Sequence, residues 1–224
     1  MIVLSDIHGN LPALEAVQDD ADSVEDAFFC GDMVGYYPWP DAVIETAREN
    51  GFRAVRGNHD EALVSDSTFG FNSVAAEALD WTRENISDPA LEYLEGIPYS
   101  RRESMSGVEI LMVHGSPQRP VSEYVYPGQV DEKFVERQDV DVDILLLGHT
   151  HVPFVNQVAG TLVVNPGSVG QPRDGDPRAS YAEIDLQEQS AEVHRVEYDI
   201  DRVEEKVGEV DLPVTLAERL KRGQ

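Results

Sequence analysis

The sequence predicts an α/β protein built around a parallel β-sheet, and two features of its first sixty residues support this. Short apolar runs alternate with segments of helical periodicity, and glycines or polar residues separate them. The resulting order β-α-β-α-β is the one from which parallel sheets are built. Because 224 residues are enough to bury a full core, we expect one domain over residues 1–224.

The apolar runs are short and suit buried strands, and the helices between them carry recognisable start signals. Asn10 and Pro12 mark a helix start, with the asparagine at the cap and the proline in the first turn. In chain order we expect a strand at 2–4, a helix from about 11, a strand at 27–30, a helix at 41–50 and a strand at 52–55.

The chain changes character after residue 60. Apolar residues at helical spacing predict a small helical insertion over about 61–105, with helices near 75–86 and 90–94. Further strands are expected at 108–113, 143–147, 161–165 and 180–184, and an alternating edge strand at 192–198. Residues 201–224 are charged with a weak apolar stripe, which predicts a peripheral helix and a frayed tail.

The composition is strongly acidic, with a formal net charge of -26, a pI near 4.3 and only three lysines. Such a surface repels nucleic acid, so non-specific DNA or RNA binding is not expected. We hypothesise adaptation to high salt, because at about 1 M salt the screening length falls to roughly 3 Å. An ordinary acidic protein is the alternative, and thermal melting across a salt series would distinguish the two.

Cysteine content and hydropathy indicate where the protein works. Cys30 is the only cysteine, which excludes an intramolecular disulfide and favours a reducing compartment. The longest apolar run, 144–147, is far shorter than a membrane span, and the first residues lack a charged leader. We therefore expect a cytoplasmic protein without membrane segments.

Polar residues gather where the predicted strands end. In open α/β sheets ligands bind at the carboxyl ends of the strands, since the loops converge there. Five of the six histidines occupy these positions, although Asp, Asn and His also serve as simple turn residues. The five elements are Asp6-x-His8, Gly31-Asp32, Gly57-Asn58-His59-Asp60, His114-Gly115 and Gly148-His149-Thr150-His151.

Carboxylate and imidazole groups together suit borderline divalent ions such as Mn²⁺, Zn²⁺ or Fe²⁺. Two aspartates, one asparagine and four histidines are too many ligands for one ion. Two ions about 3.5 to 4 Å apart can polarise a phosphoryl group and lower the pKa of a water between them. The candidate ligands are Asp6, His8, Asp32, Asn58, His114, His149 and His151.

With these motifs in this order, residues 1 to about 170 resemble the calcineurin-like metallophosphoesterase superfamily. The chain is most similar to small prokaryotic phosphodiesterases and diadenosine tetraphosphatase-like proteins, through residues 31–38, 56–60 and 165–174. The resemblance implies a four-layer α-β-β-α sandwich, in which two mixed β-sheets pack face to face and the helical insertion lies over the active site.

The resemblance also implies roles for individual residues. Asp6, His8 and His151 would hold one ion, Asn58, His114 and His149 the other, and Asp32 both. His59 would face the phosphate, assisting the leaving group or stabilising the transition state, with Asp60 supporting the site or serving only as a helix cap. The nucleophile would be a bridging hydroxide.

The chain departs from part of the superfamily at the arginine that binds phosphate. Relatives close to the protein phosphatases follow G-D with V-D-R-G, where this chain has Met33-Val-Gly-Tyr36, which argues against a protein phosphatase. Arg56 and Arg173 are the candidate substrate-binding residues, or else surface ion-pair partners. Tyr36, Tyr37 and Trp39 either stack on a base or pack beneath the insertion.

The sequence thus predicts a metal-dependent phosphodiesterase or nucleotide phosphohydrolase that acts on a small phosphoester or nucleotide. The alternative enzyme is a phosphomonoesterase. A non-catalytic scaffold with this fold is the alternative of another class, although the complete ligand set favours an enzyme. We expect the protein to bind two divalent ions, with Mn²⁺ as the first candidate and Zn²⁺, Fe²⁺ or Ni²⁺ as alternatives. A homo-oligomer is compatible with the sequence.

Overall fold

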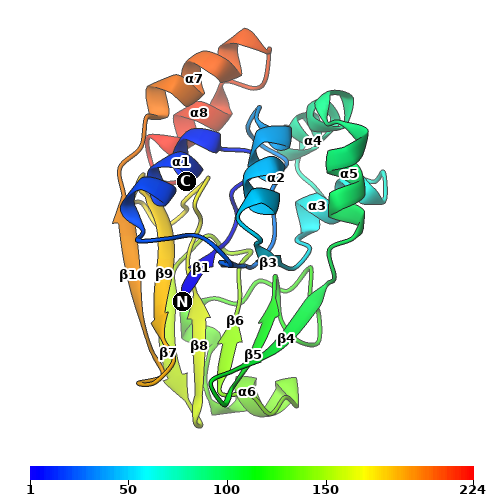
Figure 1. Cartoon of the computed structure of the whole chain (residues 1–224). Coiled ribbons are helices and arrows are strands. Elements are labelled where there is room, and N and C mark those ends of the chain that lie inside the picture. The colour runs from blue at the N-terminus through cyan, green and yellow to red at the C-terminus, as the bar shows by residue number, and fades with distance from the viewer.

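A computed structural model describes all 224 residues and confirms the predicted four-layer architecture, with two mixed β-sheets between layers of helices (Figure 1). The first sheet has the order β10 (Ser190–Val196), β9 (Ala179–Asp185), β1 (Ile2–Leu4), β2 (Phe28–Phe29) and β3 (Arg53–Ala54). The second has the order β4 (Ser100–Met105), β5 (Val108–Val113), β6 (Ile144–Leu146), β8 (Thr161–Asn165) and β7 (Phe154–Val158). In each sheet three parallel strands lie side by side and antiparallel strands complete it.

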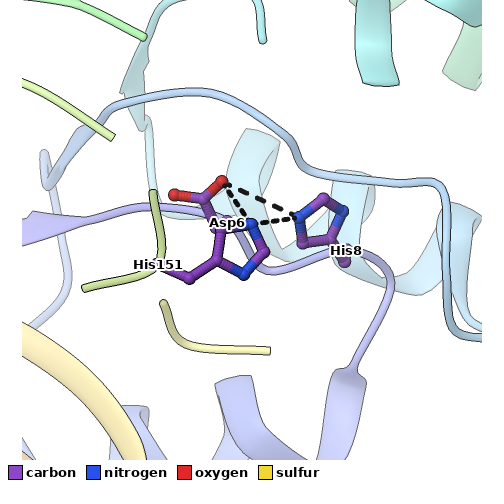
Figure 2. Close-up of side chains that lie close together, drawn as sticks. All are labelled: Asp6, His8 and His151. Atoms are coloured by element: carbon purple, nitrogen blue, oxygen red, sulfur yellow. Dashed lines mark hydrogen bonds and ion pairs between the residues drawn. The ribbon is translucent and has the colours of Figure 1, made fainter. Parts of the chain in front are cut away.

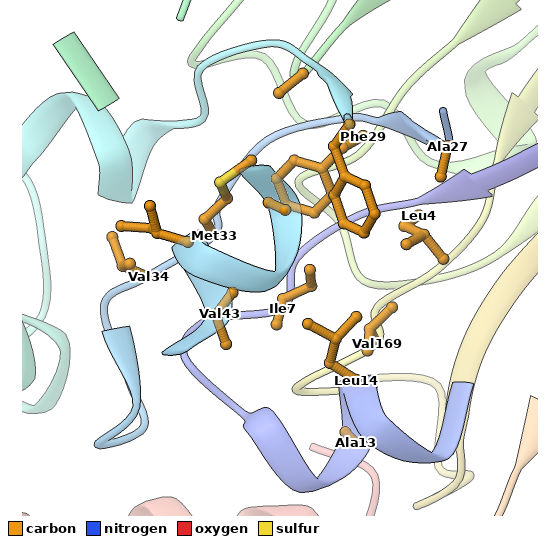
Figure 3. Packing of buried hydrophobic residues seen from close by; sticks show 14 of the residues in the cluster. Leu4, Ile7, Ala13, Leu14, Ala27, Phe29, Met33, Val34, Val43 and Val169 are labelled. Carbon is orange, nitrogen blue, oxygen red and sulfur yellow. The ribbon is translucent and has the colours of Figure 1, made fainter. Parts of the chain in front are cut away.

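The centre of the first sheet is buried on both faces because its short strands β1 and β2 are apolar at every position. Leu4 and Phe29 pack against the helices, in the cluster shown in Figure 3, whereas Val3 and Phe28 face the second sheet. Burying one such side chain contributes about 1.5–3 kcal/mol. The helices over this sheet include α1 (Leu11–Asp20), which Asn10 caps by accepting from the Ala13 N–H, and α2 (Pro40–Glu49).

The outer face of the second sheet is covered by α6 (Glu132–Gln138), which follows the 3₁₀ turn Pro127–Gln129. Phe134 of α6 packs in a cluster with Leu145 and Val163. This apolar contact closes the fourth layer.

Three helices form the segment predicted as an insertion: α3 (Asn58–Val64), α4 (Ser73–Asn85) and α5 (Asp88–Glu95). Helix α3 begins directly at Asn58, so the Gly57–Asp60 motif makes a helical turn. Residues 100–105, grouped with the insertion in the sequence analysis, instead form the edge strand β4. Its charged residues are exposed or half-buried, so no apolar run marks the strand.

The C-terminal segment is packed more firmly than the expected frayed tail. Helices α7 (Ile200–Glu209) and α8 (Thr215–Leu220) bury Val203, Val207 and Leu216 in one cluster with Tyr37. The apolar residues are few but spaced for one helical face, which the many charges around them obscure in the sequence. No helix of the protein combines the length and apolar character needed to cross a membrane.

Candidate metal centre

The seven candidate ligands converge at the carboxyl ends of the strands, beside a cavity of about 300 Å³. Four of them line it: Asp32, Asn58, His149 and His151. The loops after β1, β2, β5 and β6 and the first turn of α3 supply the seven ligands. All seven are buried except Asn58, which is half-buried. The structure therefore gathers side chains that are up to 145 positions apart in the chain, from Asp6 to His151.

A first group consists of Asp6, His8 and His151, shown in Figure 2. Nε2 of His151 lies 3.2 Å from Nε2 of His8 and 3.2 Å from Oδ1 of Asp6. Oδ1 of Asp6 is buried and has no hydrogen-bond partner. Two ring nitrogens and an unpartnered carboxylate oxygen that converge in this way are suitable ligands for a divalent cation.

A second group consists of Asp32, His114 and His149, with Asn58 beside it. Nε2 of His114 lies 3.0 Å from Oδ1 of Asn58 and 3.1 Å from Nδ1 of His149. Nε2 of His149 is buried and has no hydrogen-bond partner. This donor set, too, suits a divalent cation.

Asp32 lies between the two groups. Its Oδ2 is 3.7 Å from Nε2 of His8 and 3.4 Å from Nε2 of His114. Its Oδ1 accepts a 2.8 Å hydrogen bond from the His59 backbone N–H. One carboxylate oxygen is thus held by the backbone while the other faces both groups.

Backbone carbonyls orient three of the histidines. An Nδ1–H that donates to a carbonyl leaves the Nε2 lone pair available to a metal. The Nδ1 atoms of His8, His114 and His151 lie 3.2, 2.7 and 2.5 Å from the carbonyls of Val34, Cys30 and Gln171. In each case Nε2 is the nitrogen directed into a donor group.

The backbone is strained at the ligands. Twelve non-glycine residues have positive φ, and five of them are candidate ligands with φ between +53° and +69°. These are Asp6, His8, Asp32, His149 and His151. Each left-handed residue costs of the order of 1 kcal/mol, so such a concentration marks a site that the surrounding structure holds in place.

The segment 165–170 supplies much of that support. The Ser168 hydroxyl donates to the Asp6 carbonyl at 2.7 Å, and the Gly170 N–H donates to the same oxygen at 2.9 Å. The Asn165 amide donates to the Gly148 carbonyl at 2.7 Å. This segment contacts the ligand loops and does not line the cavity.

Asp60 holds the backbone of the ligand loops. Its carboxylate accepts from the N–H groups of Asp32 (2.9 Å), Met33 (2.9 Å) and Gly57 (3.0 Å), and it does not line the cavity. Burial and the nearby Asp32 raise the pKa of Asp60 to about 7, against the opposite effect of these N–H donors.

His59 lines the cavity and contacts the first group. Its ring centroid lies 4.6 Å from those of His8 and Tyr36, and its Nδ1 is buried without a partner. Burial lowers the pKa of His59 well below its usual range. Gly35, at φ +113°, admits the ring, because an added Cβ would lie 2.4 Å from Nδ1. His59 also lies within ligand reach of His8 and Asp32, so the geometry alone allows it a place in the donor set.

The protonation of the histidines follows from their neighbours. Burial, and then the charge of His114, lower the pKa of His149 to about 3, and burial with Arg173 lowers that of His151 to about 4. For His114 burial acts in the same direction, but the Asp32 carboxylate outweighs it and the pKa rises to about 9. Without metal, His114 therefore carries a proton at neutral pH.

The two arginine candidates differ in position. Arg173 lines the cavity, and its Nη2 donates to Oε1 of Gln171 (2.7 Å) and the Tyr36 hydroxyl (3.3 Å). Arg56 lies outside it, where Nη1 donates to Oε2 of Glu61 at 2.9 Å. The structure thus brings Arg173, but not Arg56, to the ligands.

Several cavity residues carry no signal in the sequence. The Tyr124 ring stacks on His149 with centroids 3.7 Å apart, Phe69 is 96% exposed at the cavity wall, and Arg219 enters from α8. Tyr36 also lines the cavity, whereas Tyr37 is buried beneath it.

Comparison with known proteins agrees with this site. The model of the calcineurin-like phosphoesterase superfamily domain matches residues 1–189. An uncharacterised protein of Methanocaldococcus jannaschii is 36% identical, over 99% of this chain and 97% of its own. The resemblance inferred from the motifs is confirmed.

Two solved structures share the fold over the whole chain. A metallophosphoesterase from Sphaerobacter thermophilus has 38% identity and a TM-score of 0.84, and covers 100% of this chain and 98% of its own. A hypothetical protein from Pyrococcus horikoshii OT3 has 25% identity and a TM-score of 0.89, with the same coverage.

Proposed function

The chain belongs to the calcineurin-like phosphoesterase superfamily, and we propose that it is a phosphodiesterase or nucleotide phosphohydrolase with a dinuclear metal centre. The observation that carries the proposal is the place of Asp32, whose Oδ2 faces His8 of one donor group and His114 of the other. A carboxylate in that position is suited to binding two cations at once.

The distances support one assignment of the ligands. We propose that Asp6, His8 and His151 bind one ion, that Asn58, His114 and His149 bind the other, and that Asp32 binds both. Mn²⁺ is the first candidate, because the mixed imidazole and carboxylate set suits borderline ions, with Zn²⁺, Fe²⁺ and Ni²⁺ as alternatives.

When bound, the two ions would polarise the phosphoryl group and lower the pKa of a water between them. We propose that hydroxide from this water is the nucleophile.

The chain's own residues would bind the phosphate and handle the leaving group. His59, with its lowered pKa, is neutral at pH 7, and we propose that it interacts with the phosphate and the leaving oxygen. Arg173 would grip phosphate oxygens with its planar guanidinium. Asp60 would act through Asp32, by holding its backbone, and is a positioning residue.

Three substrates and one metal test the proposal. With Mn²⁺ we expect turnover of bis-p-nitrophenyl phosphate, loss of that activity with EDTA, and recovery on adding Mn²⁺. Turnover of p-nitrophenyl phosphate alone would favour a phosphomonoesterase, and turnover of diadenosine tetraphosphate would favour a nucleotide hydrolase. No turnover of any substrate with two metals bound would favour the non-catalytic scaffold.

We also propose that the enzyme works in the cytoplasm of an organism adapted to high salt. A single free and buried cysteine, Cys30, supports the cytoplasm. The net charge of -26 supports adaptation to high salt. A melting temperature that is highest at low salt would contradict that adaptation.

A further inference from the structure

The cavity contains two arginines that pair with no Asp or Glu side chain. Arg173 and Arg219 are the only arginines or lysines in its lining, and neither lies within 4.0 Å of an Asp or Glu carboxylate oxygen. Ten of the fourteen arginines do form such ion pairs, in a chain with 43 acidic residues. Two guanidinium groups in one cavity, neither of them paired with an Asp or Glu, therefore indicate an anionic ligand.

Arg219 is held in place by the packing of α8. Leu216 and Leu220 are fully buried in the cluster that contains Tyr37, and the Tyr37 hydroxyl donates to the Leu216 carbonyl at 3.3 Å. The Arg219 Nε donates at 3.1 Å to the backbone oxygen of Gln224, the last residue of the chain, which occupies one edge of the guanidinium. The helix thus presents a positioned guanidinium whose terminal nitrogens have no protein partner.

Arg173 and Arg219 serve different parts of the cavity. The Arg173 backbone N–H donates to the His151 carbonyl at 3.2 Å, and its side chain contacts Tyr36, so it belongs to the wall beside the metal ligands. Arg219 comes from a helix that contributes no ligand, and it lies beyond residues 1–189. A single phosphate at the metal centre would be bound by Arg173 and two cations. It would not need Arg219.

We propose that Arg219 binds a second anionic group of the substrate, separate from the phosphate at the metal centre. The substrate is then a phosphoester or phosphoanhydride with at least two anionic groups, such as a nucleoside di- or polyphosphate, in preference to a simple phosphate ester. A guanidinium suits this task because it forms two parallel hydrogen bonds with phosphate oxygens. This inference rests on the proposed function, since it places the first phosphate at the metal centre.

Equilibrium binding of two hydrolysis-resistant anions tests the inference. Methylphosphonate carries one anionic group and methylenediphosphonate carries two. Both are titrated calorimetrically into the Mn²⁺-loaded protein at one buffered free Mn²⁺ concentration, and metal content is measured afterwards. Arg219→Gln should weaken binding of the diphosphonate by about tenfold and that of methylphosphonate by less than about twofold. Arg219→Lys should lie between the two.

Arg222→Gln is the matched control. Arg222 is three positions away, exposed, and 4.0 Å from Glu218, and it does not line the cavity, so both affinities should stay at the wild-type values. Equal diphosphonate binding by wild type, Arg219→Gln and Arg219→Lys would overturn the inference, as would equal losses for both anions. Thermal melting verifies that the variants fold.

The calorimetric measurement also distinguishes failure of the second anion site from failure of the proposed function. Calorimetry needs no turnover, so a wild-type protein that hydrolyses none of the three test substrates contradicts the proposed function. A selective loss of diphosphonate binding in Arg219→Gln would still support a second anion site next to the metals.

Discussion

The inner and outer walls of the cavity are built differently. The inner wall consists of strand-end loops whose aspartates and histidines are at most 4% exposed, with left-handed backbone at five of them. The outer wall comes from helices and two loops, and in those loops Phe69 is 96% and Tyr124 48% exposed. Rigid elements thus position the groups that would do chemistry, and adjustable side chains surround the space that a substrate would occupy.

The largest effect is expected from the residue at the centre of the inner wall. Asp32→Asn removes the charge that faces both donor groups, so we expect loss of at least one metal and a fall in rate of about 10³-fold or more, or about 4 kcal/mol. Metal analysis and the bis-p-nitrophenyl phosphate rate measure this. An Asp32→Asn variant with two bound metals and a wild-type rate would contradict the role of the inner wall in metal binding and catalysis.

A change at His59 tests whether this residue takes part in catalysis or binds a metal. We expect His59→Ala to keep both metals and to lose about 10²- to 10⁴-fold in rate, the usual range for a proton-transfer residue. Since His59 also lies within ligand reach of His8 and Asp32, a lost metal would assign it to the donor set instead. His194→Ala, on β10 and outside the cavity, is the control and should leave metals and rate unchanged.

Asp60 tests how the inner wall is held. In Asp60→Asn one oxygen and an NH₂ group replace the two oxygens that accept from three backbone N–H groups. Buried donors without partners cost about 1–3 kcal/mol each, so we expect the free energy of unfolding to fall by about 2–4 kcal/mol. Urea denaturation measures it. Asp80→Asn, on an exposed part of α4, should change stability by less than about 0.5 kcal/mol, and an equal effect of both changes would refute the role.

The smallest effect concerns pH. Because the pKa of His114 is raised to about 9 in the metal-free protein, a metal must displace its proton. Metal affinity should therefore increase with pH up to about 9, by at most about tenfold per unit for this one proton. Calorimetry in buffers of different ionisation enthalpy counts the released protons. A metal affinity that stays constant between pH 6 and 8 would contradict the predicted increase with pH.

The difference between the walls also explains what the sequence can predict. The ligands follow apolar strands directly, as with Asp6 after 2–4, so the hydrophobic pattern places them at one sheet edge. Arg56 and Arg173 look equivalent in the sequence, because only the fold brings Glu61 to one and the cavity to the other. Arg219 has no such marker, since its place depends on the packing of α8.

Strand β4 was not predicted, and helix α8 stands where a frayed tail was expected, for the same reason. Their apolar residues are few and are separated by charges, so their positions depend on long-range contacts that no local pattern reports. The helical start at Asn58 was missed because its cap is a glycine, with Asp60 accepting from the Gly57 N–H.

The central claim is that Asp32 lies between two cations. Anomalous diffraction from crystals grown with Mn²⁺ tests this most directly. We predict two peaks about 3.5–4 Å apart, one beside Asp6, His8 and His151 and the other beside Asn58, His114 and His149, with Asp32 in contact with both. A single peak, or peaks away from Asp32, would contradict it.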